Sequence, residues 1–227
     1  GGEAALAALQ RLDRGEPDAM REVSEVAARV PVATRDRLKV TAVEILARQR
    51  RVGEARHALA HLPGTAHPTL YALVDAVDGD PHGVTMLDEM VRAQPVPAVA
   101  RYALLARLLT GRASEIPSVY LALPSSAQSR DQLRELQYLA HVRGDFLAAA
   151  TIGELQLGLD ERPDPWVLYN TACSWSRVGD RDRALLRLGQ AVDAGWSDAT
   201  QLDTDQDLAP LWVSDRFREI RRRLSPA

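Results

Sequence analysis

The sequence is short of lysine, cysteine and aromatic residues. Lys39 is the only lysine among 28 basic residues, which excludes the phosphate-binding loop that ends in Gly-Lys-Ser/Thr and most Schiff-base chemistry. Cys173 is the only cysteine, so no disulfide can form within the chain; this suits a reducing compartment, and we expect a cytoplasmic protein. Aromatic residues make up 5% of the chain, and Ala, Leu and Arg are abundant. Because strands favour aromatic residues and helices favour Ala, Leu and Arg, we do not expect an all-β fold.

Long hydrophobic runs, excess charge and catalytic motifs are also missing. No stretch of about 18 uncharged apolar residues occurs, so we expect no membrane insertion of this segment. The net charge of −3 attracts neither nucleic acid nor an anionic membrane. There is no Gly-x-Ser-x-Gly, His-Glu-x-x-His or glycine-rich dinucleotide turn. We therefore predict a protein that is not an enzyme, needs no cofactor and binds no nucleic acid.

An aspartate-rich segment near the C-terminus resembles the start of a calcium loop. Asp203, Asp205 and Asp207 alternate, and carboxylates at such positions of a tight turn can converge on one cation. Leu208 stands where that loop needs glycine, and Ser214 stands where it needs a bidentate glutamate. We therefore predict no metal site here and interpret the aspartates as helix caps or solvated side chains.

Three histidines lie close together in the first third of the chain. His57 and His61 are four residues apart and could share one face of a helix, as zinc ligands sometimes do, and His67 follows nearby. No cysteine or carboxylate lies near enough in sequence to complete a tetrahedral site. We interpret them as surface histidines and predict no metal.

Glycine followed by a polar or charged residue recurs along the chain, with helical periodicity between the repeats. The glycines are Gly15, Gly53, Gly79, Gly111, Gly144 and Gly179. Glycine readily ends a helix because it adopts the left-handed conformation, and an acidic residue after it suits the start of the next helix. Proline or a Ser, Thr or Asp cap marks a second break between successive glycines. Each repeat is therefore predicted to hold two helices.

This punctuation predicts helices over 3–14, 17–30, 34–51, 54–61, 68–78, 81–94, 97–110, 112–122, 126–143, 145–159, 165–178 and 180–194. Pro117 is expected to interrupt or shorten the helix after Gly111. A single hairpin of this length cannot bury its apolar face alone, so the hairpins are expected to stack into a solenoid. The alternative is a globular helical bundle without repeat symmetry.

The last complete hairpin has the most regular pattern of large and small residues. Its marker residues are bulky Leu168, small Ala172, aromatic Trp175, the corner Gly179-Asp180 and small Ala184. This spacing resembles the tetratricopeptide repeat (TPR) family, in which small residues let two helices approach closely. A weaker copy precedes it, with Gln137 where a small residue would be expected.

The resemblance implies an all-α, right-handed solenoid of about six hairpins with a C-terminal capping helix. It implies one domain over 1–227, with divergent hairpins over 1–124, the clearest TPR units over 125–194 and a C-terminal cap over 195–227. The cap looks like the terminating segment of bacterial TPR arrays. The residues expected to cover the apolar end of the stack are Leu208, Leu211, Trp212, Phe217 and Ile220.

In the TPR family the first helix of each hairpin lines a concave groove. The residues that this resemblance implies for the groove are Arg101, Asp131, Arg134, Tyr138, His141, Trp166, Tyr169, Cys173 and Arg177. Aromatic rings beside guanidinium groups suit a peptide, and we expect an acidic or C-terminal segment as the ligand. The alternative is that Trp166 and Tyr169 only pack against the neighbouring hairpin.

We therefore expect a scaffold that binds a partner peptide or protein in its groove. The alternative is a regulatory or substrate-recruiting domain of a larger enzyme, such as a kinase or membrane protease, separated from an N-terminal catalytic part. The start at Gly1-Gly2, without methionine, favours this alternative. The bias of arginine over lysine suggests a bacterial source. The partner and the oligomeric state do not follow from the residues.

Overall fold

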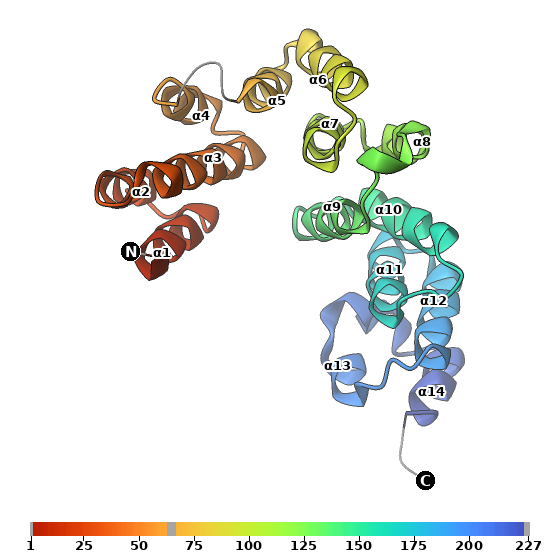
Figure 1. Cartoon of the computed structure of the whole chain (residues 1–227). Helices are drawn as coiled ribbons and strands as arrows, with labels where there is room; N and C mark the ends of the chain where they lie inside the picture. Colours follow the sequence, from red (N-terminus) through yellow and green to blue (C-terminus); the bar gives the residue numbers. More distant parts are fainter. Residues whose placement is uncertain (1, 63–66, 225–227) are drawn as a thin grey trace. The chain divides into compact units, whose positions relative to one another are not determined.

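The computed structural model describes residues 2–62 and 67–224, and within these ranges the chain contains helices and no strand (Figure 1). The helices are α1 (Gly2–Asp13), α2 (Ala19–Ala28), α3 (Val32–Arg48), α4 (Val52–Leu59), α5 (Pro68–Asp78), α6 (Pro81–Ala93), α7 (Pro97–Leu109), η1 (Ala113–Glu115), α8 (Ile116–Ala122), η2 (Ser125–Ala127), α9 (Arg130–Val142), α10 (Phe146–Leu159), α11 (Pro165–Val178), α12 (Arg181–Asp193), α13 (Ala199–Thr204), η3 (Gln206–Leu211) and α14 (Asp215–Arg222). The prediction of an all-α protein is confirmed. In the described ranges, no helix combines the length and the apolar character that crossing a membrane requires.

The predicted helix ends agree with the structure at most corners. Positive φ angles occur at Gly15, Gly79, Gly111, Gly144 and Gly179, as the left-handed end of a helix requires. The predicted corner at Gly53 is wrong: Gly53 lies inside α4, and Arg50, with φ 58°, makes the turn instead. The eighth helix is shorter than the predicted range 112–122, because a 3-10 turn occupies Ala113–Glu115 and α8 begins at Ile116, which places Pro117 in its first turn.

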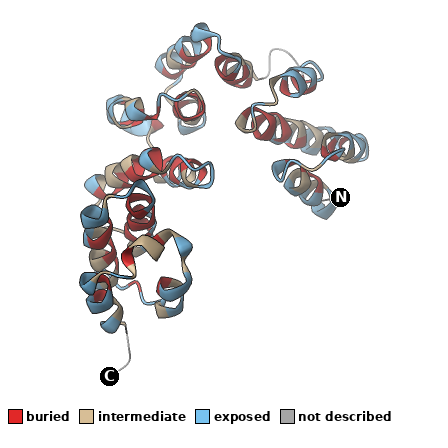
Figure 2. Cartoon of the chain, turned by 180° about the vertical axis from the view of Figure 1, so that it is seen from behind, coloured by how far each residue is buried: buried red, intermediate tan, exposed pale blue. Residues whose placement is uncertain are grey.

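The chain divides into two compact units, a division that the sequence did not indicate. The first unit contains Gly1–Arg112 and Leu123–Ala127, and the second contains Ala113–Ala122 and Gln128–Ala227. In both units the helices pack mainly against their neighbours along the chain. Figure 2 shows that the buried residues follow the helix faces that meet within each unit.

The first unit contains α1 to α7 and η2. Besides neighbouring pairs, alternate helices also contact one another: α1 with α3, α3 with α5 and α5 with α7. α5 and α6 approach each other closely at Gly83. A Cβ atom there would lie 2.4 Å from the Ala76 nitrogen and 2.6 Å from the Ala72 oxygen. The contact is therefore one backbone against another, which only glycine permits.

In the second unit, side chains of α11 and α12 form the centre of the hydrophobic core. Its buried residues include all of the predicted marker side chains, Leu168, Ala172, Trp175 and Ala184. The C-terminal segment covers this core: η3 packs on α11 and α12, and α14 packs on α12. Leu208, Leu211, Phe217 and Ile220 are buried and Trp212 is partly buried, so the predicted covering residues do pack on the core.

Gln137 occupies the position at which the repeat pattern expects a small residue. Its Nε2 donates to Thr171 Oγ1 at 3.1 Å, and its Oε1 accepts from Gln156 Nε2 at 2.7 Å. The small residue is found instead on the facing helix: a Cβ at Gly153 would lie 2.1 Å from Thr171 Oγ1 and 2.5 Å from Gln137 Nε2. The space that glycine leaves on α10 is filled by a buried chain of polar side chains.

Candidate binding site

The local sequence explains how α11 presents its first aromatic residue. Pro165 stands in the first turn of the helix, where its missing N–H is not needed, and the Asp164 side chain caps the helix by accepting from the Trp166 N–H at 2.8 Å. Trp166 is therefore held in the first turn, and 56% of it is exposed.

A pocket of about 450 Å³ opens beside this helix turn, between α9, α11 and the segment that contains α13 and η3. Six of the residues predicted for the groove line it: Arg134, Tyr138, His141, Trp166, Tyr169 and Cys173. The lining residues that the sequence analysis missed are Gln137, Asp164, Val167, Asn170, Ser174, Gln201, Asp205 and Asp207. Four of them lie on the two predicted helices, Asp164 caps α11, and three come from the C-terminal segment.

Three of the predicted groove residues do not line the pocket. Asp131 is exposed on α9, and Arg177 binds Asp207 at the edge, with Nη1 to Oδ1 at 2.7 Å. Arg101 belongs to the first unit, where its Nη2 lies 2.9 Å from Oε2 of the buried Glu44. Its role is in the packing of α7 on α3, because Tyr102 also donates to Glu44.

The aromatic rings of the site divide into a buried pair and an exposed pair. Tyr169 is buried and stacks on Trp196, with ring centroids 4.3 Å apart and planes 8° apart. Trp166 meets Tyr169 edge to face at 6.3 Å. Trp166 and Tyr138 are 56% and 70% exposed. Tyr169 therefore serves in packing, as the alternative interpretation of the groove expected. Trp166 and Tyr138, in contrast, keep large surfaces exposed to solvent.

Asp205 joins the C-terminal segment to α11. Its Oδ2 accepts from the Tyr169 hydroxyl at 2.7 Å and from the Cys173 thiol at 3.7 Å, and its Oδ1 caps η3 by accepting from the Asp207 N–H at 3.0 Å. Burial raises the pKa of Tyr169, and the neighbouring thiol and Asp205 raise that pKa further. The carboxylate thus has two protonated partners.

The Cys173 thiol is a poor nucleophile in this environment. Burial is the main cause that raises its pKa well above the usual value, and the negative charges of Asp205 and Asp207 raise it further. Because the thiolate is the reactive species, a thiol that keeps its proton at neutral pH does not suit covalent catalysis.

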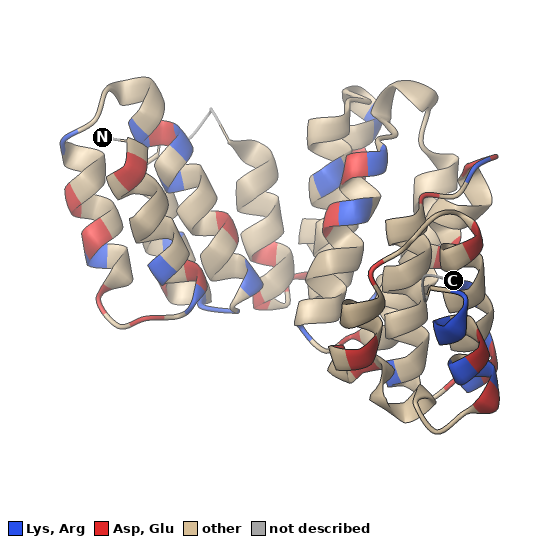
Figure 3. Ribbon diagram, turned by 90° about the horizontal axis from the view of Figure 1, so that it is seen from below, with Lys and Arg blue, Asp and Glu red and all other residues tan. Residues whose placement is uncertain are grey.

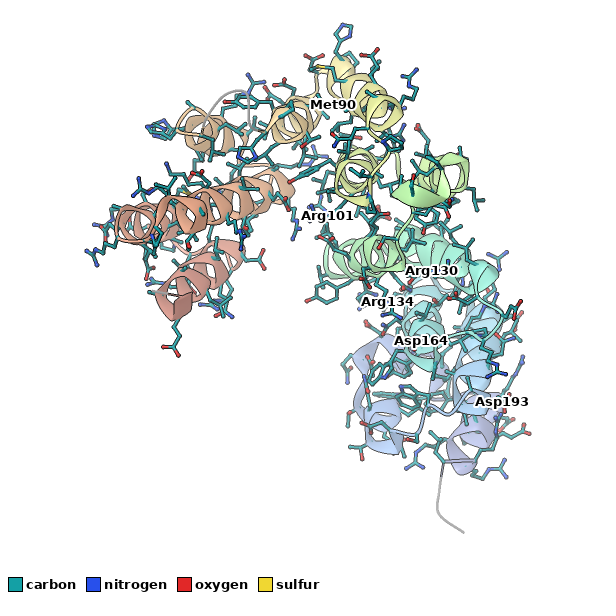
Figure 4. All side chains as sticks on the ribbon, viewed as in Figure 1. Met90, Arg101, Arg130, Arg134, Asp164 and Asp193 are labelled. Atoms are coloured by element: carbon teal, nitrogen blue, oxygen red, sulfur yellow. The ribbon has the colours of Figure 1, made fainter. Side chains whose placement is uncertain are left out.

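Every cation at the pocket has a carboxylate partner. Arg134 Nη2 lies 3.1 Å from Asp164 Oδ2, a pair labelled in Figure 4. Asp207 binds Arg177, and its Oδ2 lies 2.8 Å from His141 Nε2. Among the described residues of the lining there is one arginine, Arg134, against three aspartates. The lining is therefore negative when His141 is neutral, although Figure 3 shows both signs of charge mixed along the helices.

The alternating aspartates do not form a metal site. Asp203 turns away from Asp205 and Asp207 and binds Arg221, with Oδ1 and Nε 2.8 Å apart. This bond lowers the pKa of Asp203. Across residues 2–62 and 67–224, no group of three or more His, Cys, Asp or Glu side chains is placed to hold a metal ion.

The likeness to the TPR family is carried by the marker residues of α11 and α12 and has no support from other proteins. Comparisons with protein-family models, with curated proteins and with solved structures found no match to this chain.

Proposed function

We propose that the chain is a TPR-like solenoid of stacked hairpins that binds a segment of another protein at the pocket of α9, α11 and η3. Contacts between alternate helices in the first unit support stacking, because the first helices of consecutive hairpins meet in such a solenoid. The pocket residues belong mainly to α9 and α11, the first helices of their hairpins.

The observation that carries the proposal is the exposure of Trp166 and Tyr138 at a pocket of about 450 Å³. Large exposed aromatic side chains beside a concavity are typical of binding surfaces, where tryptophan and tyrosine contribute most of the affinity. The Trp166 ring meets Tyr169 and Trp196 edge to face, with ring centroids 6.3 and 6.5 Å apart, and these contacts limit its movement before a ligand binds. A partner side chain can therefore pack on the exposed part of the ring at a smaller entropic cost.

The charge of the pocket lining indicates which charge the ligand carries. The sequence predicts an acidic segment because it places arginines in the groove. Asp164, Asp205 and Asp207 line the pocket as well, and the arginines at this site are bound to Asp164 and Asp207. We therefore propose a ligand that combines an apolar side chain with a lysine or arginine, since a basic group would find carboxylates and an acidic group would not.

The test is selection from a displayed library of random peptides on the whole protein. We expect the selected peptides to contain an apolar residue near arginine or lysine, and Trp166→Ala to weaken a selected synthetic peptide about tenfold or more, measured by fluorescence anisotropy. Leu147→Ala is the matched control, because Leu147 is 58% exposed on α10 and does not line the pocket.

Two results would contradict the proposal in different ways. Enrichment of acidic peptides that still need Trp166 would keep the site and restore the ligand charge that the sequence predicts. Equal loss of binding in the Trp166→Ala and Leu147→Ala variants, or no selectable peptide at all, would remove the site.

A further inference from the structure

A second pocket lies in the first unit and has a different composition. It has a volume of about 340 Å³ and lies between α2, α3 and α4. Its lining residues are Met20, Val23, Ser24, Ala27, Ala28, Arg35, Lys39, His57, Ala58 and His61. Among the residues that the structure describes, the lining contains no carboxylate, and it includes Lys39, the only lysine in the sequence.

The floor of this pocket is apolar. Val23, Ala27 and Ala58 are buried, and Met20 is half-buried beside them. Three of these side chains come from the inner face of α2 and one from α4. A hydrocarbon placed here would leave water for apolar surface, which is favourable in proportion to the area covered.

Two cations stand beside this floor and bind neutral acceptors. Arg35 Nε donates to the Ala27 carbonyl oxygen at 2.9 Å, and Lys39 Nζ donates to the His61 carbonyl oxygen at 3.1 Å. Carbonyl groups orient these side chains without neutralising their charge. Lys39 has three donors and uses one in this bond, so the others remain for a ligand.

Other arginines of this unit that are buried or partly buried bind carboxylates instead of carbonyl oxygens. Arg107 binds Asp88 through two hydrogen bonds of 2.9 and 2.8 Å, and Arg101 binds Glu44 in the same manner. Arg35 and Lys39 are half-buried, yet no carboxylate is among the described residues that line the pocket with them. An anion from outside the chain would supply the missing charge.

Two histidines line the same pocket, and one of them can add a donor. The rings of His57 and His61 lie 4.9 Å apart. His61 Nδ1 lies 2.9 Å from the His57 carbonyl oxygen, which can only accept, so this nitrogen is the donor and Nε2 of a neutral His61 is an acceptor. The ring N–H of His57 is therefore the imidazole donor that can bind an oxygen of an anion.

We propose that this pocket binds a small organic carboxylate with a compact hydrocarbon body. Lys39 and Arg35 contact the carboxylate, and the floor of Met20, Val23 and Ala27 covers the hydrocarbon. The pocket has the size of a small-molecule site. A metal ion would be repelled by the two fixed cations, and inorganic phosphate would leave the apolar floor uncovered.

The test uses octanoate, octanamide, acetate and inorganic phosphate as probes, with the whole chain in solution. Binding is followed by calorimetry and by NMR of the histidine ring signals. We expect octanoate to bind at one site and to shift the signals of His57 and His61. Octanamide lacks the charge and acetate lacks the hydrocarbon, and each should bind at least about tenfold more weakly than octanoate.

Lys39→Gln should weaken octanoate binding about tenfold, because a charge-assisted hydrogen bond is lost. Arg35→Gln should have a similar effect and gives a second reading if the first variant is poorly folded. Arg92→Gln is the matched control: Arg92 is an exposed cation of the same unit that donates to the Asp88 carbonyl of its own helix. This control should bind octanoate as the unchanged chain does.

The proposal is overturned if octanamide binds as tightly as octanoate, if phosphate displaces octanoate at equal concentration, or if well-folded Lys39→Gln and Arg35→Gln bind octanoate unchanged. Shifts of histidine signals spread over both units would also overturn it, since they indicate detergent-like binding.

Discussion

The two pockets are built from similar packed helices but differ in how their charges are balanced. At the pocket of the second unit, Arg134 binds Asp164 and Arg177 binds Asp207. At the pocket of the first unit, Arg35 and Lys39 donate to carbonyl oxygens of Ala27 and His61. Arginine in a lining therefore does not by itself indicate an anionic ligand. The carboxylates that the fold brings beside it decide which charge the pocket attracts.

The two units also differ in how their helices make close contact. In the first unit, Gly83 brings α6 against the backbone of α5. In the second unit, Gly153 makes room for the side chains of Gln137 and Thr171. A backbone cannot move aside without shifting a whole helix, whereas side chains can change rotamer. The same small residue thus serves a rigid contact in one unit and an adaptable one in the other.

The largest expected effect comes from Gly83→Ala. The added methyl group would lie within 2.4 to 2.7 Å of backbone atoms of Ala72 and Ala76, so the two helices must separate. We expect the free energy of unfolding to fall by about 3 kcal/mol, measured by urea titration.

The control for Gly83→Ala is Gly53→Ala, because Gly53 lies in α4 and nothing comes within 4 Å of its added Cβ. That variant should gain about 0.5 kcal/mol from the better helix former. If Gly83→Ala and Gly53→Ala change the free energy of unfolding equally, the backbone contact between α5 and α6 at Gly83 is contradicted.

A smaller effect is expected from Gly153→Ala in the second unit. Its methyl group meets the Thr171 hydroxyl and the Gln137 amide, which can rotate away only by giving up buried hydrogen bonds. We expect a loss of about 2 kcal/mol in the same urea titration.

Adding Gln137→Ala to Gly153→Ala restores the small residue that the repeat pattern expects on α9. The double variant should lose less than the sum of the two single losses, since the added methyl then occupies space that the amide left. If the losses in the free energy of unfolding are additive, Gly153 and Gln137 do not compete for the same space. The proposed contrast between a side-chain contact at Gly153 and a backbone contact at Gly83 would then be wrong.

The smallest effect concerns alkaline pH, to which the second unit should be the more sensitive. Burial raises the pKa of Cys173 and of Tyr169 in the folded chain, so the unfolded chain releases these protons first. The stabilisation is complete below the pKa of the unfolded thiol, and is lost as the pH rises above about 8.5. We expect the free energy of unfolding to fall by about 1 kcal/mol between about pH 8 and about pH 9.5.

Cys173→Ser removes the thiol and should make that decline shallower. Hydrogen exchange followed by mass spectrometry would show whether peptides of α9 to α14 lose protection before those of α1 to α7. In the first unit Tyr102 also has a pKa raised by burial and by Glu44, but a phenol ionises at higher pH than a thiol. If the free energy of unfolding falls equally with pH in the unchanged chain and in Cys173→Ser, the thiol is not the cause of the decline.

Part of the binding site follows from sequence because its residues share helix faces. Tyr138 and His141 are one turn apart on α9, and Tyr169 and Cys173 are one turn apart on α11. The repeat pattern could not place Arg101, whose partner Glu44 lies on a helix far away in the chain. Likewise, Gly153 could not be identified as the small residue that accommodates Gln137, because the spacing of one helix says nothing of the facing one.

By itself, the sequence determined the helices, most of their glycine corners and the apolar faces that they bury. These signals act over one or two turns: Asp164 before Pro165 starts a helix, and Gly179 ends it. Only the tertiary structure decided that Asp207 reaches His141, 66 residues away, and that Lys39 meets no carboxylate at its pocket. The reason is that capping and periodicity are local, whereas the partner of a charge depends on which distant helices pack together.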